Sequence, residues 1–229
     1  MKFLIKFLFI AGLSLLSCTT QAALIDRGNR LIYDNDLNIT WLQDANFAKT
    51  SSYDADGRLN WAAANAWAEQ LTIAGISGWR LPGLTDSNVY VGANSSNSEL
   101  AHLFYDELGG QAEADLAVQH NGNYALFNNL QSSVYWQKDQ LAIAPGLALG
   151  WGFVMGGGVL SGYQNLYNES SEFHAWAVHG GDIGAIVNDV PPASVPVPAA
   201  AWLFATGLLG VLGIRSKKNM VFKHWARLC

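Results

Sequence analysis

Hydrophobic and polar positions divide the chain into a strand-rich start, two helices and a second strand-rich region. In residues 24–42 (LIDRGNRLIYDNDLNITWL), apolar pairs alternate with the turn sequences Asp-Arg-Gly-Asn and Asp-Asn-Asp. This alternation predicts short strands joined as a hairpin. From Tyr124 onward, four apolar segments lack helical periodicity and are separated by Gly, Asn and Ser: YALFNNL, SVYWQ, LALGWGFVMGGGVLSGY and FHAWAVHGG. They predict further strands, two of them joined by a hairpin at Gly156-Gly157-Gly158.

Two amphipathic helices are predicted between these regions. Asn60 can cap the first and Gly75 can close it, and its apolar residues share one face: Trp61, Ala64, Trp67, Ala68, Leu71 and Ala74. The second is expected over about residues 97–108, with a capping box of Ser96 and Glu99, an end at Gly109-Gly110, and a stripe of Leu100, Leu103, Phe104 and Leu108. Helices that are grouped, with strands before and after them, indicate an α+β fold with several short antiparallel strands.

The first residues have the pattern of a secretory signal peptide. Lys2 and Lys6 are followed by the apolar stretch 7–16, and the small residues Thr20 and Ala22 fit a cleavage site after Ala22. The domains are therefore expected to be a signal peptide over residues 1–22 and a globular domain over 23–189. An alternative is a lipobox at 15–18 with Cys18 lipidated. If Cys18 leaves with the signal, only Cys229 remains, and no intramolecular disulfide can form.

Charge is distributed unevenly along the chain. Residues 23–194 contain six of the 13 basic residues and all 18 acidic ones, which leaves this stretch with a net charge of −12. A nucleic acid is therefore not expected as a partner bound by charge. The other seven basic residues stand beside the apolar runs at the two ends, which is typical of membrane-inserting segments.

The other end resembles a membrane anchor. Residues 190–198 form a proline-rich linker, and 199–214 is an uncharged run of 16 residues that predicts a transmembrane helix of about 24 Å. Such a helix is shorter than the roughly 30 Å hydrocarbon core of a bilayer. Arg215, Lys217 and Lys218 follow directly, so the tail 215–229 is expected in the cytoplasm and the domain outside. A simple single-span protein that faces the periplasm is one interpretation.

The segment Trp79-Arg80-Leu81-Pro82 has a structural explanation. Trp79 and Leu81 are expected to face the core as alternating strand residues, and Pro82 fixes the backbone at the strand exit. Arg80 is expected to bind a carboxylate or backbone carbonyls, with a ligand contact as the alternative.

This segment also resembles the DWRLP motif of the DUF1566 domain, the C-terminal domain of the Legionella collagen-like protein. Four more matches follow the family's order within residues 24–183: Ile39-Thr40-Trp41, Glu99-Leu100, Ser132-Ser133-Val134-Tyr135-Trp136, and Ala175-Trp176-Ala177-Val178-His179-Gly180-Gly181, where His179 replaces an arginine. The resemblance implies a C-type-lectin-like α+β domain. The family's founding member binds sulfated polysaccharides, a ligand class that the charge of −12 does not favour.

The C-terminal segment is similar to the VPLPA form of the PEP-CTERM sorting signal. Its motif is Val195-Pro196-Val197-Pro198-Ala199, and the apolar run and basic cluster follow in the family's order. The resemblance implies that an exosortase, a membrane protease, recognises the motif in the inner membrane. The processed protein is then expected at the cell surface or in the extracellular matrix of a polysaccharide-producing Gram-negative host. Residues 219–229 extend beyond the basic cluster, where such signals usually end.

Two acidic loops are candidates for a calcium site, and Ca²⁺ is the one cofactor that the sequence suggests. Oxygen ligands occur at alternate positions in Asp34, Asp36 and Asn38 and again in Asp54 and Asp56. Neither loop is an EF-hand, and Asx turns before a strand and a helix explain the same residues.

No catalytic residues are predicted. None of the histidines at 102, 120, 174 and 179 stands in a recognised catalytic motif. Most of the domain's seven tryptophans are expected in the core, with one or two rings exposed for sugar stacking: Trp41, Trp61, Trp67, Trp79, Trp136, Trp151 and Trp176. The sequence thus favours an exported binding or structural protein with polysaccharide as a partner. An exported enzyme that acts on cell-surface polysaccharide is the alternative.

Overall fold

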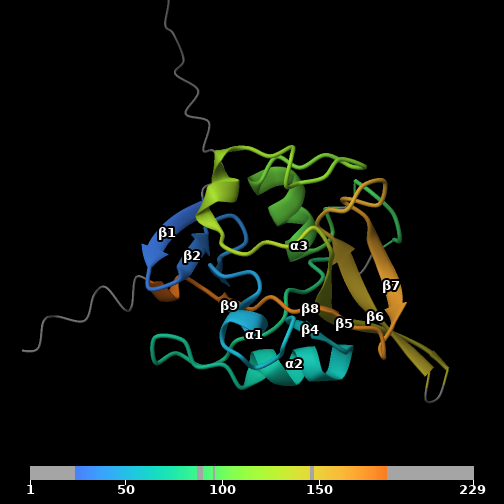
Figure 1. Cartoon of the computed structure of the whole chain (residues 1–229), viewed down its shortest axis with the longest axis horizontal. Coiled ribbons are helices and arrows are strands. Elements are labelled where there is room, and N and C mark those ends of the chain that lie inside the picture. The colour runs from blue at the N-terminus through green and yellow to red at the C-terminus, as the bar shows by residue number, and fades with distance from the viewer. Residues whose placement is uncertain (1–23, 87–89, 95, 145–146, 185–229) are drawn as a thin grey trace, which may run out of the picture. The chain divides into compact units, whose positions relative to one another are not determined.

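A computed structural model describes residues 24–86, 90–94, 96–144 and 147–184 (Figure 1). The chain divides into the units Met1–Val187 and Asn188–Cys229, and every described residue belongs to the first. Within the described ranges, no helix has the length and apolar character needed to cross a bilayer. The predicted signal peptide 1–22, linker 190–198, helix 199–214 and tail 215–229 lie outside these ranges, as do the sorting motif and the basic cluster.

The described strands form two sheets (Figure 1). The first has the order β1-β2-β3-β9 and is antiparallel throughout, with strands β1 (Leu24–Gly28), β2 (Leu31–Asp34), β3 (Ile39–Leu42) and β9 (Val178–Gly180). The second has the order β4-β8-β5-β6-β7, with strands β4 (Arg58–Leu59), β8 (Phe173–His174), β5 (Val134–Ala144), β6 (Leu147–Val154) and β7 (Gln164–Asn168). Among the described pairings of this second sheet, those of β5 with β6, β6 with β7 and β4 with β8 are antiparallel, and the pair Tyr135 and His174, which joins β5 to β8, is parallel.

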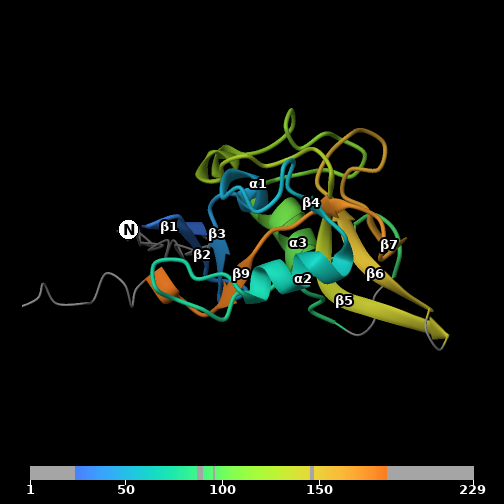
Figure 2. The same ribbon diagram turned by 60° about the horizontal axis from the view of Figure 1, so that its bottom comes forward.

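The predicted α+β class is confirmed, with strands in the majority and few helices. The hairpin expected in residues 24–42 is also confirmed, because β2 pairs with both β1 and β3. The helical segments are α1 (Phe47–Thr50), α2 (Trp61–Glu69), α3 (Glu99–His102), a π-helix (Leu103–Glu107) and a 3₁₀-helix (Gly122–Leu126). In both ribbon views α3 lies between the two sheets (Figure 2).

Helix α2 begins where the sequence predicts and ends earlier than expected. The side chain of Asn60 caps it by accepting a hydrogen bond from the backbone N–H of Ala63. The helix ends at Glu69 rather than near Gly75. Ala74 and Gly75 both have positive φ and connect Ile73 to Ile76 in a tight turn, a backbone shape that an α-helix cannot continue through.

The second predicted helix ends where expected, with Leu108 as its C-cap and Gly109 at positive φ, but it differs from expectation at its start and in its hydrogen bonding. Ser98, not Ser96, is its N-cap and accepts a hydrogen bond from the N–H of Ala101. Glu99 makes no capping box, because its carboxylate binds Arg80 instead. After only four α-helical residues the chain continues as the π-helix, in which the N–H of Leu108 donates to the carbonyl of Leu103.

Two strand predictions after residue 120 need correction. The segment YALFNNL does not form a strand but the end of the 3₁₀-helix, which Asn121 caps by accepting from the N–H of Asn123. The glycine-rich segment does join two antiparallel strands, β6 and β7, but through the longer connection 155–163 rather than a tight hairpin at residues 156–158.

Aromatic rings fill the core. Trp176, between β8 and β9, is fully buried, and its ring contacts those of Trp41, Phe127 and Tyr135 at centroid distances of 5.0, 5.1 and 5.7 Å. It therefore joins a residue of the first sheet to one of the second. None of the seven tryptophans of this described domain is exposed, and only Trp61 is half-buried. The expectation of exposed tryptophan rings for sugar stacking is wrong.

Candidate functional site

The two acidic loops form Asx turns. The carboxylate of Asp34 accepts hydrogen bonds from the N–H groups of Asp36 and Leu37, both at 3.1 Å. That of Asp54 accepts from the N–H groups of Asp56 and Gly57, and the bond from Asp56 is the main reason why the pKa of Asp54 is lowered. Asn38 accepts from the hydroxyl of Tyr33.

The predicted calcium ligands do not meet at one point. Among the described residues, no three of Asp34, Asp36, Asp54 and Asp56 gather with their oxygens close enough to share an ion. The acidic residues of these two loops therefore form Asx-turn hydrogen bonds to the backbone.

The segment Trp79–Pro82 is held by an ion pair. The guanidinium of Arg80 donates to both oxygens of Glu99, at 2.7 and 2.6 Å, and also to the carbonyl of Leu81. One oxygen of Glu99 further accepts from the N–H of Gly83. Trp79, Leu81 and Pro82 are buried. In the described residues, the contacts of Arg80 are thus internal ones that fix the segment against α3.

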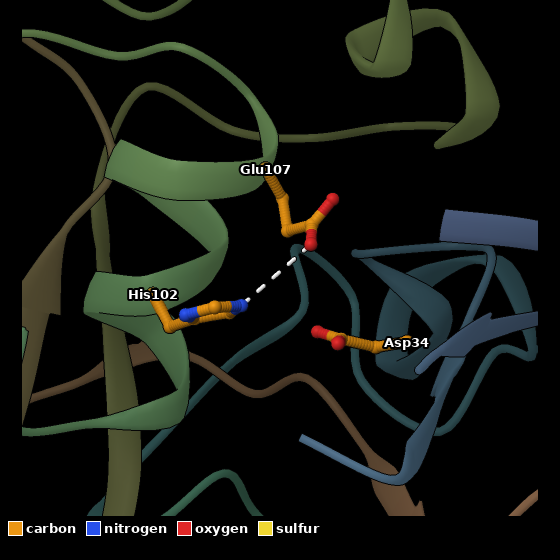
Figure 3. Close-up of side chains that lie close together, drawn as sticks. All are labelled: Asp34, His102 and Glu107. Atoms are coloured by element: carbon orange, nitrogen blue, oxygen red, sulfur yellow. Dashed lines mark ion pairs between the residues drawn. The ribbon is translucent and has the colours of Figure 1, made fainter. Parts of the chain in front are cut away.

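The structure brings together a cluster that the sequence patterns do not reveal: Asp34, His102 and Glu107 (Figure 3). Asp34 ends β2, His102 ends α3, and Glu107 ends the π-helix. One ligand atom of each lies within 4.8 Å of those of the other two. Figure 3 shows the three side chains pointing toward one another, Asp34 from β2 and the other two from the continuous α3 and π-helix segment. Asp34 and Glu107 are 0% and 1% exposed, and His102 is half-buried.

The π-helix places Glu107 beside His102. In an α-helix, residues five apart point about 140° away from each other, because each residue turns the chain by about 100°. A π-helix, with hydrogen bonds from residue i to i+5, has a wider turn, so residues five apart lie much closer to the same side than in an α-helix. The imidazole Nε2 of His102 consequently lies 3.6 Å from an oxygen of Glu107. Its other nitrogen, Nδ1, lies 3.1 Å from Asp106, one ordinary helical turn away.

Several polar atoms in the cluster have no hydrogen-bond partner. Nε2 of His102 and both carboxylate oxygens of Glu107 are buried and have no hydrogen-bond partner within the described structure. The contact of 3.6 Å between Nε2 and one of these oxygens is an ion pair only when His102 is protonated. Asp34 is better satisfied, since its second oxygen accepts from the indole N–H of Trp41 at 3.3 Å. Buried polar groups in proteins nearly always have a hydrogen-bond partner, so three buried atoms of one cluster without such a partner are unusual.

The surroundings of the cluster raise the pKa values of both His102 and Asp34. The pKa of His102 is raised, first by the adjacent Glu107 carboxylate and then by the charges of Asp34 and Asp106, which outweigh burial. The pKa of Asp34 is also raised, because burial disfavours its charged form more than the bonds from Leu37 and Trp41 favour it. The cluster thus offers one imidazole nitrogen and two carboxylates to a common point, an arrangement that can hold a proton or a cation.

The other histidines make separate contacts. His174 is buried against Tyr135, and burial, followed by the charge of Arg58, lowers its pKa. The imidazole of His179 and the ring of Trp79 lie in an edge-on contact. His120 stacks on Tyr124. None of these three joins the cluster.

A groove of about 180 Å³ opens beside β3 and α1. Its lining is polar around one aromatic ring: Arg30, Gln43, Asp44, Phe47, Thr50 and Asn128. Backbone bonds between Gln43 and both Arg30 and Asn128 fix its walls, and the guanidinium of Arg30 lies 5.6 Å above the ring of Phe47. Asp44 is held by the hydroxyl of Thr50 and the amide of Asn129. This site, like the cluster, combines residues that no sequence motif connects.

Comparison of the chain with protein-family models, with curated proteins and with solved structures finds no match in any of the three.

Proposed function

We propose that the chain is an exported protein, sorted to the cell surface or extracellular matrix through its C-terminal segment, whose domain is a lectin-like module that binds carbohydrate. The motif Val195-Pro196-Val197-Pro198-Ala199, the short apolar run and the basic cluster support sorting by an exosortase. The signal-peptide pattern of residues 1–22 supports export. Two small, mainly antiparallel sheets with helices between and beside them are consistent with a lectin-like fold.

The observation that carries the binding function is the groove lined by Arg30, Gln43 and Asn128. A sugar presents hydroxyls that both donate and accept hydrogen bonds, and planar polar side chains in fixed positions match such a pattern. Arg30 offers donors, while the exposed amide of Asn128 offers both a donor and an acceptor. With a net charge of −12 in residues 23–194, the domain is suited to neutral rather than sulfated glycans.

Replacing Arg30 by alanine is expected to weaken glycan binding about tenfold. A hydrogen bond that involves a charged group contributes about 1.5–3 kcal/mol. A tenfold loss of affinity corresponds to about 1.4 kcal/mol of binding free energy. The measurement is a glycan screen on the full chain in mild detergent, with and without EDTA, followed by titration of the best ligand. Arg58→Ala is the matched control, because Arg58 is an exposed arginine on β4 that does not line the groove.

Turnover of the same glycans is measured in parallel. Turnover that disappears on replacement of one carboxylate would contradict the binding function and support the alternative of an exported polysaccharide-acting enzyme. Equal affinity of the Arg30→Ala protein and the unmodified protein would remove the groove as the binding site.

Replacing Pro196 and Pro198 by alanine is expected to leave membrane insertion intact and to block release. Insertion depends on the apolar run and the basic cluster, whereas an exosortase is expected to read the proline motif. Mass spectrometry of the mature C-terminus in an exosortase-containing host measures the outcome. An exported protein that still ends at Cys229 would refute processing.

A further inference from the structure

We propose that Asp34, His102 and Glu107 bind a divalent cation of the borderline first-row class, represented by Zn²⁺, which joins β2 to the α3 and π-helix segment. The inference does not depend on the carbohydrate groove, whose lining contains none of the three residues. It also differs from a calcium site in the acidic loops, because two of its three ligands come from another part of the chain.

The unpaired atoms are the first argument. Glu107 is 1% exposed, yet neither of its oxygens has a hydrogen-bond partner, and one of them lies 3.6 Å from Nε2 of His102, which also lacks a hydrogen bond. Burial of an ionised carboxylate whose oxygens accept no hydrogen bond is disfavoured in a protein interior, even beside a charged imidazole. A cation at the common point would supply the missing partner for all three atoms.

The distance between His102 and Glu107 is the second argument. A charge-assisted hydrogen bond between these groups would measure about 2.7–2.9 Å, but Nε2 and the carboxylate oxygen are 3.6 Å apart. Two ligands of one tetrahedral Zn²⁺, each about 2.0–2.1 Å from the metal, lie about 3.4 Å apart. The observed separation fits two ligands of one ion better than a direct bond. The widest ligand spacing, up to 4.8 Å, requires the side chains to draw together on binding.

The hydrogen bonds that orient the side chains of His102 and Asp34 are the third argument. Histidines that bind metals commonly donate their other ring N–H to a carboxylate, which orients the ring. Nδ1 of His102 has this partner in Asp106, at 3.1 Å, so that Nε2 faces the cluster. Asp34 is oriented in a similar way by two backbone N–H groups and by the indole of Trp41.

The ligand set selects the class of cation. An imidazole nitrogen with two carboxylates suits Zn²⁺ and its neighbours, whereas Ca²⁺ takes six to eight oxygens and Mg²⁺ keeps an octahedral shell that is rich in water. Two carboxylates also neutralise the charge of a divalent ion, which favours its burial. Because Asp34 and Glu107 are buried, the ion is expected to hold two segments together.

The experiment titrates Zn²⁺ into the full chain, purified in mild detergent and freed of metal by chelation. Calorimetry and metal analysis are expected to give one ion per chain, and the melting temperature is expected to rise by mass action. Glu107→Gln and His102→Gln should each weaken binding by at least about tenfold, the loss expected even of an indirect partner. Asp106→Asn should weaken it less than either, and the exposed Glu172→Gln should match the unmodified protein.

A second probe guards against variants that fold poorly. Co²⁺ bound to the unmodified protein should show the visible absorption of tetrahedral nitrogen and oxygen coordination, and added Zn²⁺ should displace it. The proposal is overturned if Zn²⁺ does not bind, if Glu107→Gln binds it as tightly as the unmodified protein, or if Ca²⁺ raises the melting temperature equally well. A protein that binds glycan but not Zn²⁺ would contradict the metal site alone. A protein that binds Zn²⁺ but not glycan would contradict the carbohydrate function alone.

Discussion

Replacing Trp176 by alanine is expected to lower the free energy of unfolding by about 4 kcal/mol. The ring is completely buried and contacts Trp41, Phe127 and Tyr135. Its indole N–H also donates to the carbonyl of Leu42 at 2.6 Å, and the substitution leaves that acceptor unpaired. Since a typical domain is stable by about 5–15 kcal/mol, the variant loses a large share of its stability.

Urea unfolding followed by far-ultraviolet circular dichroism measures the loss. Tyr53→Ala is the control, because this aromatic side chain is 48% exposed and should shift stability by less than about 0.5 kcal/mol. Trp176→Phe should fall between the two, since it keeps a ring but removes the N–H donor. If the alanine variants at 176 and 53 unfold at the same urea concentration, Trp176 does not join the sheets as described.

Replacing Arg80 by methionine is expected to cost about 3 kcal/mol. Its partner Glu99 has a side chain only 11% exposed, so the substitution leaves a nearly buried carboxylate with the N–H of Gly83 as its remaining donor. The guanidinium itself is 31% exposed, which keeps the cost at the lower end for a buried ion pair.

A double-mutant cycle separates the ion pair from the packing of the arginine stem. Glu99→Gln keeps an acceptor for the N–H of Gly83 while removing the charge. The double variant Arg80→Met with Glu99→Gln should therefore lose less free energy of unfolding than the two single variants lose together. The coupling is expected to exceed about 1 kcal/mol. Arg58→Met, at an exposed arginine that donates to the carbonyl of Glu172, should lose much less. Strictly additive effects would show that Arg80 acts through packing alone.

The fold was predictable from sequence where local signals agree with tertiary packing. Alternating apolar pairs and turn residues located β1 to β3, and Asn60 marked the start of α2. The two errors in the helices have different origins. Glu99 binds Arg80, distant in sequence, instead of closing a capping box, which is a tertiary contact. Helix α2 ends at Glu69 although the apolar periodicity continues, and the local turn at Ala74 and Gly75 lies beyond that end.

The candidate cluster was beyond sequence reasoning for two physical reasons. Asp34 and Glu107 are far apart in the chain and meet only when β2 packs against the helical segment. His102 and Glu107 are five residues apart, a spacing that points side chains away from each other in an ordinary α-helix. Only the π-helix aligns them, and no residue pattern in 103–107 distinguishes it from an α-helix. Asp34 is predicted as a candidate calcium ligand of a local acidic loop, not as part of a site shared with α3.

The position of β9 has a consequence for the order of folding. This strand, near the end of the described chain, pairs with β3 near its start, and the hydroxyl of Thr40 donates to the carbonyl of Gly181, 141 residues away. Arg80 pairs with Val178 of the same strand, so β9 joins segments from two earlier regions. Contacts at such separations carry a large loop-closure cost and slow folding. A ribosome must therefore synthesise nearly all of this domain before its first sheet can be completed.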